Sequence, residues 1–396
     1  MSLNKSHYLV FLFIIHQSES SSQACSSIRL LSLPPIFEEN WDNATQFPVG
    51  YDFIGGILNN KLVLWGGLQK QRNTKEYLLP ANVVYSFTPP GPRSNAEGTW
   101  EKTLATGNVH PGRASAAFTV LNNLVYILGG QYKNERGDDI FVNDFTTLSA
   151  EGNFTRLSLT GDIPFPRIYA EAWSYNDFIF FFGGLVQKID EKRNQDFAER
   201  EKGQDYYTNE TYRLHPSTNN IVRLETKGTP PSPRRWFAMA QIDHRVFIQG
   251  GFGNHDGNTY FPLSDFFALD LDTFEWSEIK PSGIPDGLRA HSLTAVSSSQ
   301  LLLVGGDDFF ITDRIAIFDL DKFEWKEREH LPLQFGGKRG GLAFHQAFEL
   351  RNEYGLSIIC IGGYMDNNWK QHSDHAIVFY FPLKNQTTAN KPQDIE

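Results

Sequence analysis

Residues 245–251 read RVFIQGG, a short apolar run that ends in two adjacent glycines. The same pattern occurs five more times in the chain of 396 residues. The other copies are LVLWGG at 62–67, LVYILGG at 124–130, FIFFFGG at 178–184, LLLVGG at 301–306 and SIICIGG at 357–363. The double glycines recur every 54 to 67 residues. A repeat of this length indicates one structural unit that is built six times.

The repeating unit is clearest around the fourth copy. Residues 234–242 alternate along the chain as a half-buried strand does, and Asp243 with His244 is expected to turn the chain into RVFIQGG. Two more strands are expected at 266–270 (FFALD) and 273–279 (TFEWSEI). Four short strands in each of six units predict an all-β propeller with six blades.

The double glycines have a structural explanation that needs no ligand. Blades converge on the central axis of a propeller, so neighbouring backbones approach closely there. A residue without Cβ allows this approach and also permits a positive φ at the turn. We therefore expect the glycines to build the ring and not to bind a ligand.

The unit resembles the kelch repeat, which has a double glycine after the second strand, an aromatic residue in the third and Trp in the fourth. The third-strand aromatics here are Tyr85, Phe145, Tyr212, Phe267, Phe318 and Phe379, and the fourth-strand tryptophans are Trp100, Trp276 and Trp325. Units two and three depart from the pattern, with Phe154 and Ile221 in the nearest positions. The linkers at 111–113 (PGR), 164–167 (PFPR) and 231–234 (PSPR) are similar to those of kelch proteins of the Rab9-effector and host-cell-factor kind. The resemblance covers residues 28 to 383 and implies a six-bladed kelch propeller.

The last unit is one strand short. After Gly363 the chain supplies a strand at 375–382 and then a polar tail at 384–396 with no Trp strand. A strand-like segment at 27–33 (SIRLLSL) precedes the first complete unit. We expect this N-terminal segment to complete blade six and close the ring, so that the propeller spans 27–383 with fewer open edges.

The N-terminus has the features of a secretory signal. Lys5 precedes the apolar residues 8–15 (YLVFLFII), and the triplet SQA at 22–24 fits a cleavage site before Cys25. We predict a signal peptide at 1–24 and a secreted or secretory-lumen protein; without that signal the chain is cytoplasmic. The apolar run is too short to span a bilayer. In the secretory pathway four sequons become candidate glycosylation sites, at Asn43, Asn153, Asn209 and Asn385.

Composition excludes some classes of partner. The formal net charge is −10 and the sequence contains no basic stripe, which argues against nucleic-acid binding. The two cysteines, Cys25 and Cys360, do not make a disulfide framework. A His-x-x-His pattern at 372–375 lacks a further ligand of known proximity, and we predict no metal or cofactor.

An arginine recurs near the start of five units, and these residues are the first candidates for partner binding. They are Arg113, Arg167, Arg234, Arg289 and Arg339; the first unit has none. The kelch resemblance implies that this position lies near the channel mouth, where arginines bind acidic peptides. A guanidinium fork matches a carboxylate with two hydrogen bonds. In the alternative structural role these arginines satisfy backbone carbonyls, and we expect that role for most of them.

Loops supply the remaining candidates. His255 belongs to the loop at 252–261, while Tyr364 and Trp369 belong to the loop at 364–375. Loops on a rigid scaffold commonly carry function, and an exposed Trp suits stacking against a sugar ring or a partner side chain.

The sequence contains no Gly-x-Ser-x-Gly elbow, P-loop or His-Glu-x-x-His motif. We therefore predict a monomeric, non-enzymatic binding module that presents propeller-face loops to a protein or glycan. One alternative is a secreted carbohydrate-active enzyme similar to sialic-acid mutarotases, with its site at the channel mouth. The other is an intracellular kelch scaffold of the Rab9-effector type.

Overall fold

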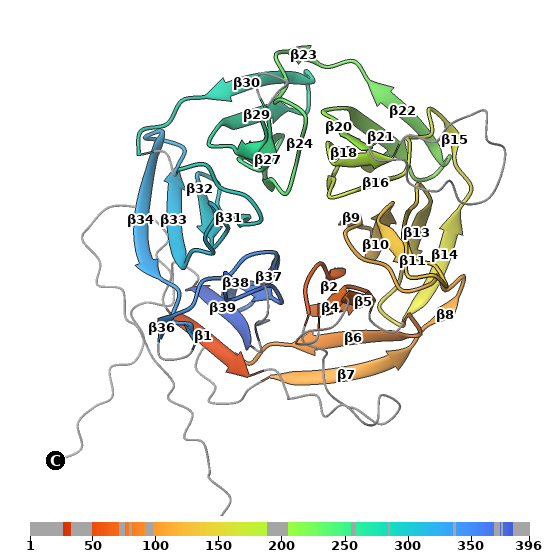
Figure 1. The fold of residues 1–396 in the computed structure, drawn as a ribbon, viewed down its shortest axis with the longest axis horizontal. Helices are drawn as coiled ribbons and strands as arrows, with labels where there is room; N and C mark the ends of the chain where they lie inside the picture. The colour runs from red at the N-terminus through yellow and green to blue at the C-terminus, as the bar shows by residue number, and fades with distance from the viewer. Residues whose placement is uncertain are drawn as a thin grey trace, which may run out of the picture.

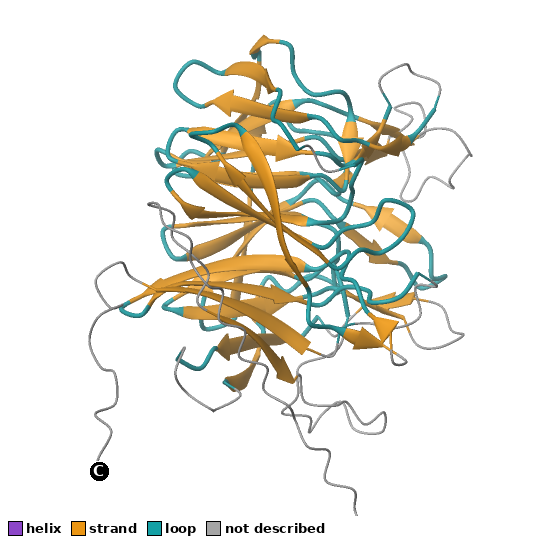
Figure 2. Cartoon of the chain, turned by 90° about the vertical axis from the view of Figure 1, so that its left-hand side faces the viewer, coloured by secondary structure: helices purple, strands orange, loops and turns teal. Residues whose placement is uncertain are grey.

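The computed structural model describes residues 27–32, 50–70, 76–78, 81–91, 98–187, 205–254, 259–283, 286–335, 338–367, 373 and 375–382. Throughout this part of the chain the regular elements are β-strands (Figures 1 and 2). Six larger sheets are arranged around a central axis, and we number them as blades one to six.

The main part of each blade is an antiparallel sheet of four strands. In blade six, one of the four strands comes from the N-terminal end of the described chain. Blade one contains β2 (Ile54–Leu58), β3 (Lys61–Trp65), β6 (Val83–Thr88) and β7 (Thr99–Leu104), and blade two contains β9 (Ala117–Leu121), β10 (Leu124–Leu128), β13 (Phe145–Leu148) and β14 (Asn153–Leu157). Blade three contains β17 (Glu171–Tyr175), β18 (Phe178–Phe182), β21 (Thr211–His215) and β22 (Asn220–Leu224), and blade four contains β25 (Ala238–Ile242), β26 (Arg245–Gln249), β29 (Phe266–Asp270) and β30 (Glu275–Ile279). Blade five contains β31 (Ser292–Ser297), β32 (Gln300–Val304), β33 (Arg314–Asp319) and β34 (Glu324–His330), and blade six contains β37 (Gln346–Asn352), β38 (Gly355–Ile361), β39 (His375–Pro382) and β1 (Ser27–Ser32).

The first strand of each blade lies nearest the axis and the fourth lies at the periphery (Figure 1). The core lies between blades, where side chains of neighbouring sheets pack face to face. The third-strand aromatic residues predicted from the repeat are all buried, as are Trp276 and Trp325. In blades two and three, Phe154 and Ile221 occupy the fourth strand and are buried in place of Trp. The kelch pattern is therefore a pattern of inter-blade packing.

The N-terminal strand β1 lies at the outer edge of the blade-six sheet, whose order is β1-β39-β38-β37. It pairs antiparallel with β39, from Ser27 opposite Tyr380 to Ser32 opposite His375. The side chain of Ile28 is buried in the same apolar cluster as Phe379. The first and last described segments of the chain therefore belong to one sheet.

The first strands are shorter than the sequence predicts. In blade four the expected strand at 234–242 divides into β24 (Arg234–Arg235) and β25, because Trp236 has a φ of 56° and interrupts the pleat. β24 instead joins a small sheet with β27 (Phe252–Gly253) and β28 (Phe261–Pro262). Blade three has the same break, with β16 (Arg167–Ile168) bonded to β19 (Leu185–Gln187) and separated from β17.

The connections between blades contain a feature that the sequence analysis missed. The two-residue strands β8 (Thr106–Gly107), β15 (Thr160–Gly161) and β23 (Lys227–Gly228) pair in parallel with the fourth strand of the following blade. Each glycine has a positive φ. These short strands partly cover the outer edges of blades two, three and four, where unpaired backbone groups would otherwise face solvent.

The structural role expected for the double glycines is confirmed. The N–H of the second glycine donates to a carbonyl of the next blade, for example from Gly67 to Arg113 at 2.8 Å. The same bond joins Gly363 to Gly50 at 2.9 Å and thus links blade six to blade one. A Cβ on Gly305 would lie 2.0 Å from the carbonyl oxygen of Leu342, and its φ of 64° is strained for other residues.

Several predicted features lie outside the described residues. They are the signal peptide at 1–24, the tail at 384–396, His255, Trp369, Asn43 and Asn385. Among the described residues we find no helix with the length and apolar character needed to cross a membrane.

Candidate binding site at the propeller axis

Six residues, one from each blade, form what we call the axial ring. They share a left-handed backbone conformation, with φ between 54° and 61°, and are Asp52, Ser115, Tyr169, Trp236, Ala290 and Phe344. Backbone hydrogen bonds connect members of neighbouring blades: Tyr169 donates to Ser115 at 2.9 Å, Ala290 to Trp236 at 2.7 Å and Phe344 to Ala290 at 2.9 Å. Bulky residues rarely adopt this conformation, and such strain is concentrated at functional sites.

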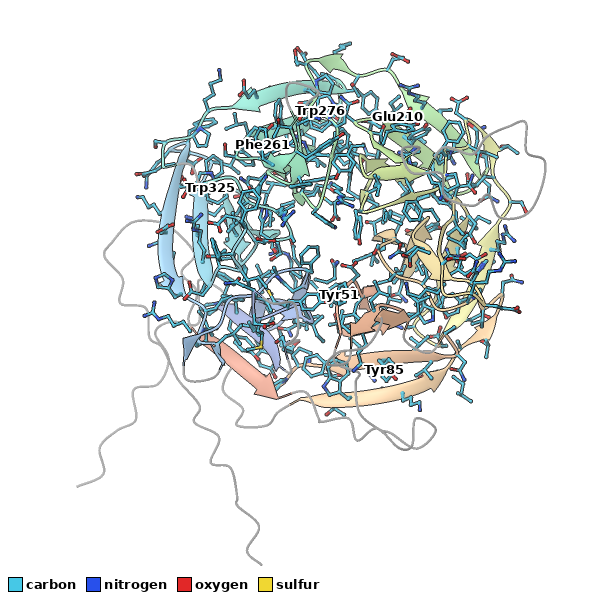
Figure 3. All side chains as sticks on the ribbon, viewed as in Figure 1. Tyr51, Tyr85, Glu210, Phe261, Trp276 and Trp325 are labelled. Atoms are coloured by element: carbon cyan, nitrogen blue, oxygen red, sulfur yellow. The ribbon has the colours of Figure 1, made fainter. Side chains whose placement is uncertain are left out.

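Aromatic side chains of the axial ring contact one another across blades. The ring centroid of Trp236 lies 5.3 Å from that of Tyr169 and 5.2 Å from that of Phe344. Phe344 in turn contacts Tyr51, which projects toward the axis (Figure 3). Blade five contributes only the methyl group of Ala290 to the ring. The small side chain at this position is consistent with the direct contact between blades four and six.

Arg235 lies among these aromatic residues. Its guanidinium carbon is 3.7 Å from the Trp236 ring centroid and 5.2 Å from that of Tyr207. Within the described part of the chain it forms no ion pair with a carboxylate, and its buried Nε has no hydrogen-bond partner. Burial lowers the pKa of Arg235, although an arginine keeps its charge in proteins. The site therefore holds a cation that is compensated mainly by aromatic faces.

A second guanidinium, that of Arg289, lies beside the first. It is 4.6 Å from the Phe252 ring centroid and 5.3 Å from that of Trp236. Its Nη2 donates to the Asp307 carboxylate at 2.8 Å. The nearby charge of Arg289 contributes to the lowered pKa of Arg235. Two guanidinium groups thus face one carboxylate among the described residues of this cluster, which leaves a local excess of positive charge. We call Arg235, Arg289, Trp236 and Phe252 the cationic cluster.

Two acidic residues near the axial ring, Asp52 and Glu171, belong to other blades than the cationic cluster. Asp52 accepts a hydrogen bond from the Ser115 hydroxyl at 2.7 Å. Burial, and secondarily the charge of Asp52, raise the pKa of Glu171 to about 8, so this carboxyl is largely protonated at neutral pH. The two guanidinium groups thus belong to blades four and five, and the carboxyl groups of Asp52 and Glu171 belong to blades one and three.

The five predicted arginines are not equivalent in the structure. Arg113, Arg167 and Arg234 are buried and form ion pairs with Asp144, Glu210 and Asp265 respectively. Arg234 makes two bonds of 2.6 Å to Asp265 and also donates to the carbonyl of Gly250 at 2.9 Å. Geometry of this kind fits the structural role that the sequence analysis allowed for most of them.

Arg289 differs because it occupies another register position. The inter-blade acceptor is the carbonyl of Arg234 in blade four but that of Leu288 in blade five, so Arg289 corresponds to Arg235. This one-residue offset places Arg289 in the cationic cluster. Arg339 has a side chain that is 71% exposed and lies 3.9 Å from Asp313.

The other described candidates do not belong to the cationic cluster, and two of them contact other residues of the protein. Tyr364 is buried and its ring lies 4.8 Å from that of Tyr51. The Asn153 side chain is exposed at the start of β14, and the Asn209 amide donates to the Pro231 carbonyl at 3.0 Å. Sequence reasoning missed Arg235 and Trp236. The signal for them was a basic residue and a large aromatic residue directly after a repeated arginine.

Comparisons with known proteins agree with this architecture. The KLHDC2/KLHL20/DRC7 Kelch-repeats domain matches residues 52–251 and 197–363, and the chain belongs to this kelch-repeat family. Kelch domain-containing protein 2 of Bos taurus is 27% identical over 286 residues, which cover 68% of this chain and 66% of that protein. Kelch domain-containing protein 1 of Mus musculus is 24% identical over 285 residues, with the same two shares. The match spans just under two thirds of the length of each of these relatives.

A solved structure shows the same fold. The chain described as the structure of YjhT superimposes with a TM-score of 0.59 at 14% identity, covering 86% of this chain and 96% of that one. At this level of identity the likeness concerns the propeller fold alone.

Proposed function

We propose that this kelch propeller is a binding scaffold that holds a carboxylate-bearing segment of a partner protein on the cationic cluster. The observation that carries the proposal is Arg235, a largely buried cation with no described carboxylate partner, next to Arg289. Burying a charge is costly unless it is paired, so an incoming carboxylate offsets a cost already present in the free protein. Two adjacent guanidinium groups can bind one carboxylate through several charged hydrogen bonds.

The aromatic residues support a peptide in preference to a free anion. Trp236, Phe252 and Tyr207 surround Arg235 and present flat apolar faces beside the charge. Aromatic residues and arginine are the side chains that dominate binding energy at protein interfaces. A glycan partner that bears a carboxylate would use the same charge, and the experiment below includes it.

The test uses an array of immobilised peptides that differ only by Glu or Gln at one position, together with a sialylated glycan as a separate probe. Selective binding of Glu peptides, weakened about tenfold or more by Arg235→Gln, is the expected result. Arg339→Gln, which changes an exposed arginine away from the cluster, is the matched control and should bind as the parent does. Equal binding of the Glu and Gln peptides would contradict the proposal, and binding of the glycan alone would redirect it to carbohydrate.

One observation favours a second candidate, the interconversion of sugar anomers. Glu171 carries a proton at neutral pH and lies near the carboxylate of Asp52, so the pair offers a proton donor and a proton acceptor. Ring opening needs a proton at the ring oxygen and removal of the anomeric hydroxyl proton; closure reverses both steps. Exchange between the anomers of N-acetylneuraminate, followed by NMR, should be accelerated by the parent and not by Glu171→Gln. A parent rate equal to buffer would eliminate this candidate.

The compartment and the monomeric state stay predictions. Expression of the full chain in a eukaryotic secretory host, followed by N-terminal sequencing of protein in the medium, tests secretion. A mature start near Cys25 supports an extracellular partner, whereas an uncleaved chain retained in the cells supports a cytoplasmic one. Light scattering of the purified protein reports its mass.

A further inference from the structure

The loop between β32 and β33 exposes two adjacent phenylalanines. Phe309 is 64% exposed and Phe310 is 67% exposed. Single exposed apolar side chains are ordinary on protein surfaces, but two large ones in succession form a patch that commonly marks an interaction site.

The loop is fixed in this conformation by hydrogen bonds. The Asp307 carboxylate accepts from the backbone N–H of Phe309 at 2.7 Å, and the Asp308 carboxylate accepts from that of Phe310 at 3.2 Å. Ile311 donates its N–H to the side chain of Asn367 in the blade-six loop. Phe309 has a φ of 85°, a strained conformation for a bulky residue. The two phenyl groups are therefore held in solvent by specific contacts.

The same loop is joined to the cationic cluster. Asp307 is buried, and the carboxylate that orients Phe309 through one oxygen binds Arg289 through the other. The guanidinium carbon of Arg289 lies 5.9 Å from the Phe309 ring centroid. A ligand bound at Arg289 is therefore next to an exposed apolar surface.

We propose that Phe309 and Phe310 form an apolar subsite for the partner segment whose carboxylate binds Arg235 and Arg289. This inference rests on the proposed function and specifies its ligand: an extended segment with a large apolar side chain close to an acidic residue. The two parts of the site are close, because the guanidinium carbon of Arg289 lies 5.9 Å from the Phe309 ring centroid. An extended chain advances about 3.3 Å per residue, so we expect the acidic and the apolar residue of the ligand to be about one to three positions apart. The positive charge of the adjacent cluster is complementary to the acidic residue of this segment. A second copy of this chain is disfavoured because two molecules of net charge −10 repel each other.

The experiment uses the full-length protein and peptides that carry Glu and Leu two positions apart, with Glu→Gln and Leu→Ser versions of each. Fluorescence anisotropy of labelled peptides gives each Kd. Replacing Leu by Ser should weaken binding to the parent about fivefold to tenfold. Phe310→Ser should remove that preference and keep the preference for Glu over Gln.

The control is Phe323→Ser, because Phe323 is 51% exposed in the turn between β33 and β34, outside the loop. This variant should retain both preferences. If peptides show the Glu preference but Phe310→Ser leaves the Leu preference unchanged, the subsite is refuted while the proposed function stands. If the Glu preference is absent, the proposed function has failed. Parent dimers that Phe310→Ser dissociates would assign the patch to self-association and overturn the subsite.

Discussion

The raised pKa of Glu171, a residue near the axial ring, makes the stability of the folded protein depend on pH. Its folded pKa of about 8 lies above the ordinary value of 4.5, so the native state holds a proton that the unfolded state releases over this pH range. The stability associated with this carboxyl is therefore full below pH 4.5 and is lost as pH rises toward 8. We expect Glu171→Gln to melt about 2 °C or more above the parent at pH 8, and the difference to shrink at pH 5. A difference in melting temperature between variant and parent that is the same at pH 5 and pH 8 would contradict the raised pKa of Glu171.

His291 and His345 produce the opposite dependence. Burial lowers the pKa of each to about 3, from an ordinary value of 6.5, and the His345 ring contacts the Ser292 hydroxyl at 2.8 Å. The unfolded chain binds protons here that the folded chain does not, so stability is full above pH 6.5 and falls as pH drops toward 3. His291→Leu should lose less melting temperature between pH 7 and pH 5 than the parent loses. An equal loss in both proteins, measured by calorimetry, would rule out this contribution.

At the scale of the structural element, buried ion pairs fix the segment that precedes each first strand in blades two, three and four. Arg234→Ala leaves the Asp265 carboxylate without its buried guanidinium and should cost about 3–5 kcal/mol of unfolding free energy. Arg339→Ala, at an exposed arginine, should stay within about 0.5 kcal/mol of the parent. Urea unfolding of the two variants gives both values. Similar midpoints would show that the buried pair contributes little.

The same segments explain how far the sequence could predict the site. The double glycines and the buried third-strand aromatic residues recur in every blade, so the sequence was sufficient to predict the propeller fold and the packing between blades. The residues of the cationic cluster were not predicted, because the left-handed conformation of Trp236 interrupts the expected strand and leaves Arg235, not Arg234, beside the axial ring. A one-residue difference in register separates the buried Arg234 from Arg235, and spacing alone assigned Arg289 to the wrong one of these two positions.

At the scale of the whole molecule, the N-terminal strand is predicted to stabilise the ring. β1 covers the edge of β39 through six residue pairs, and without it that edge is open. A chain beginning at Pro34 should melt about 5 °C or more below the full-length protein. A chain beginning at Ser27 retains β1 and serves as the control. Equal melting temperatures for the two shortened chains would show that the strand is dispensable.

Three neighbouring pairs of the axial ring are joined through main-chain N–H and carbonyl groups, which are the same whichever side chain is attached. Ring geometry and ligand chemistry are therefore specified by different atoms. Under the proposed function, a substitution at Tyr169, Trp236 or Phe344 alters the surface offered to a ligand while these main-chain bonds remain. A new ligand preference then requires no new connection between these blades.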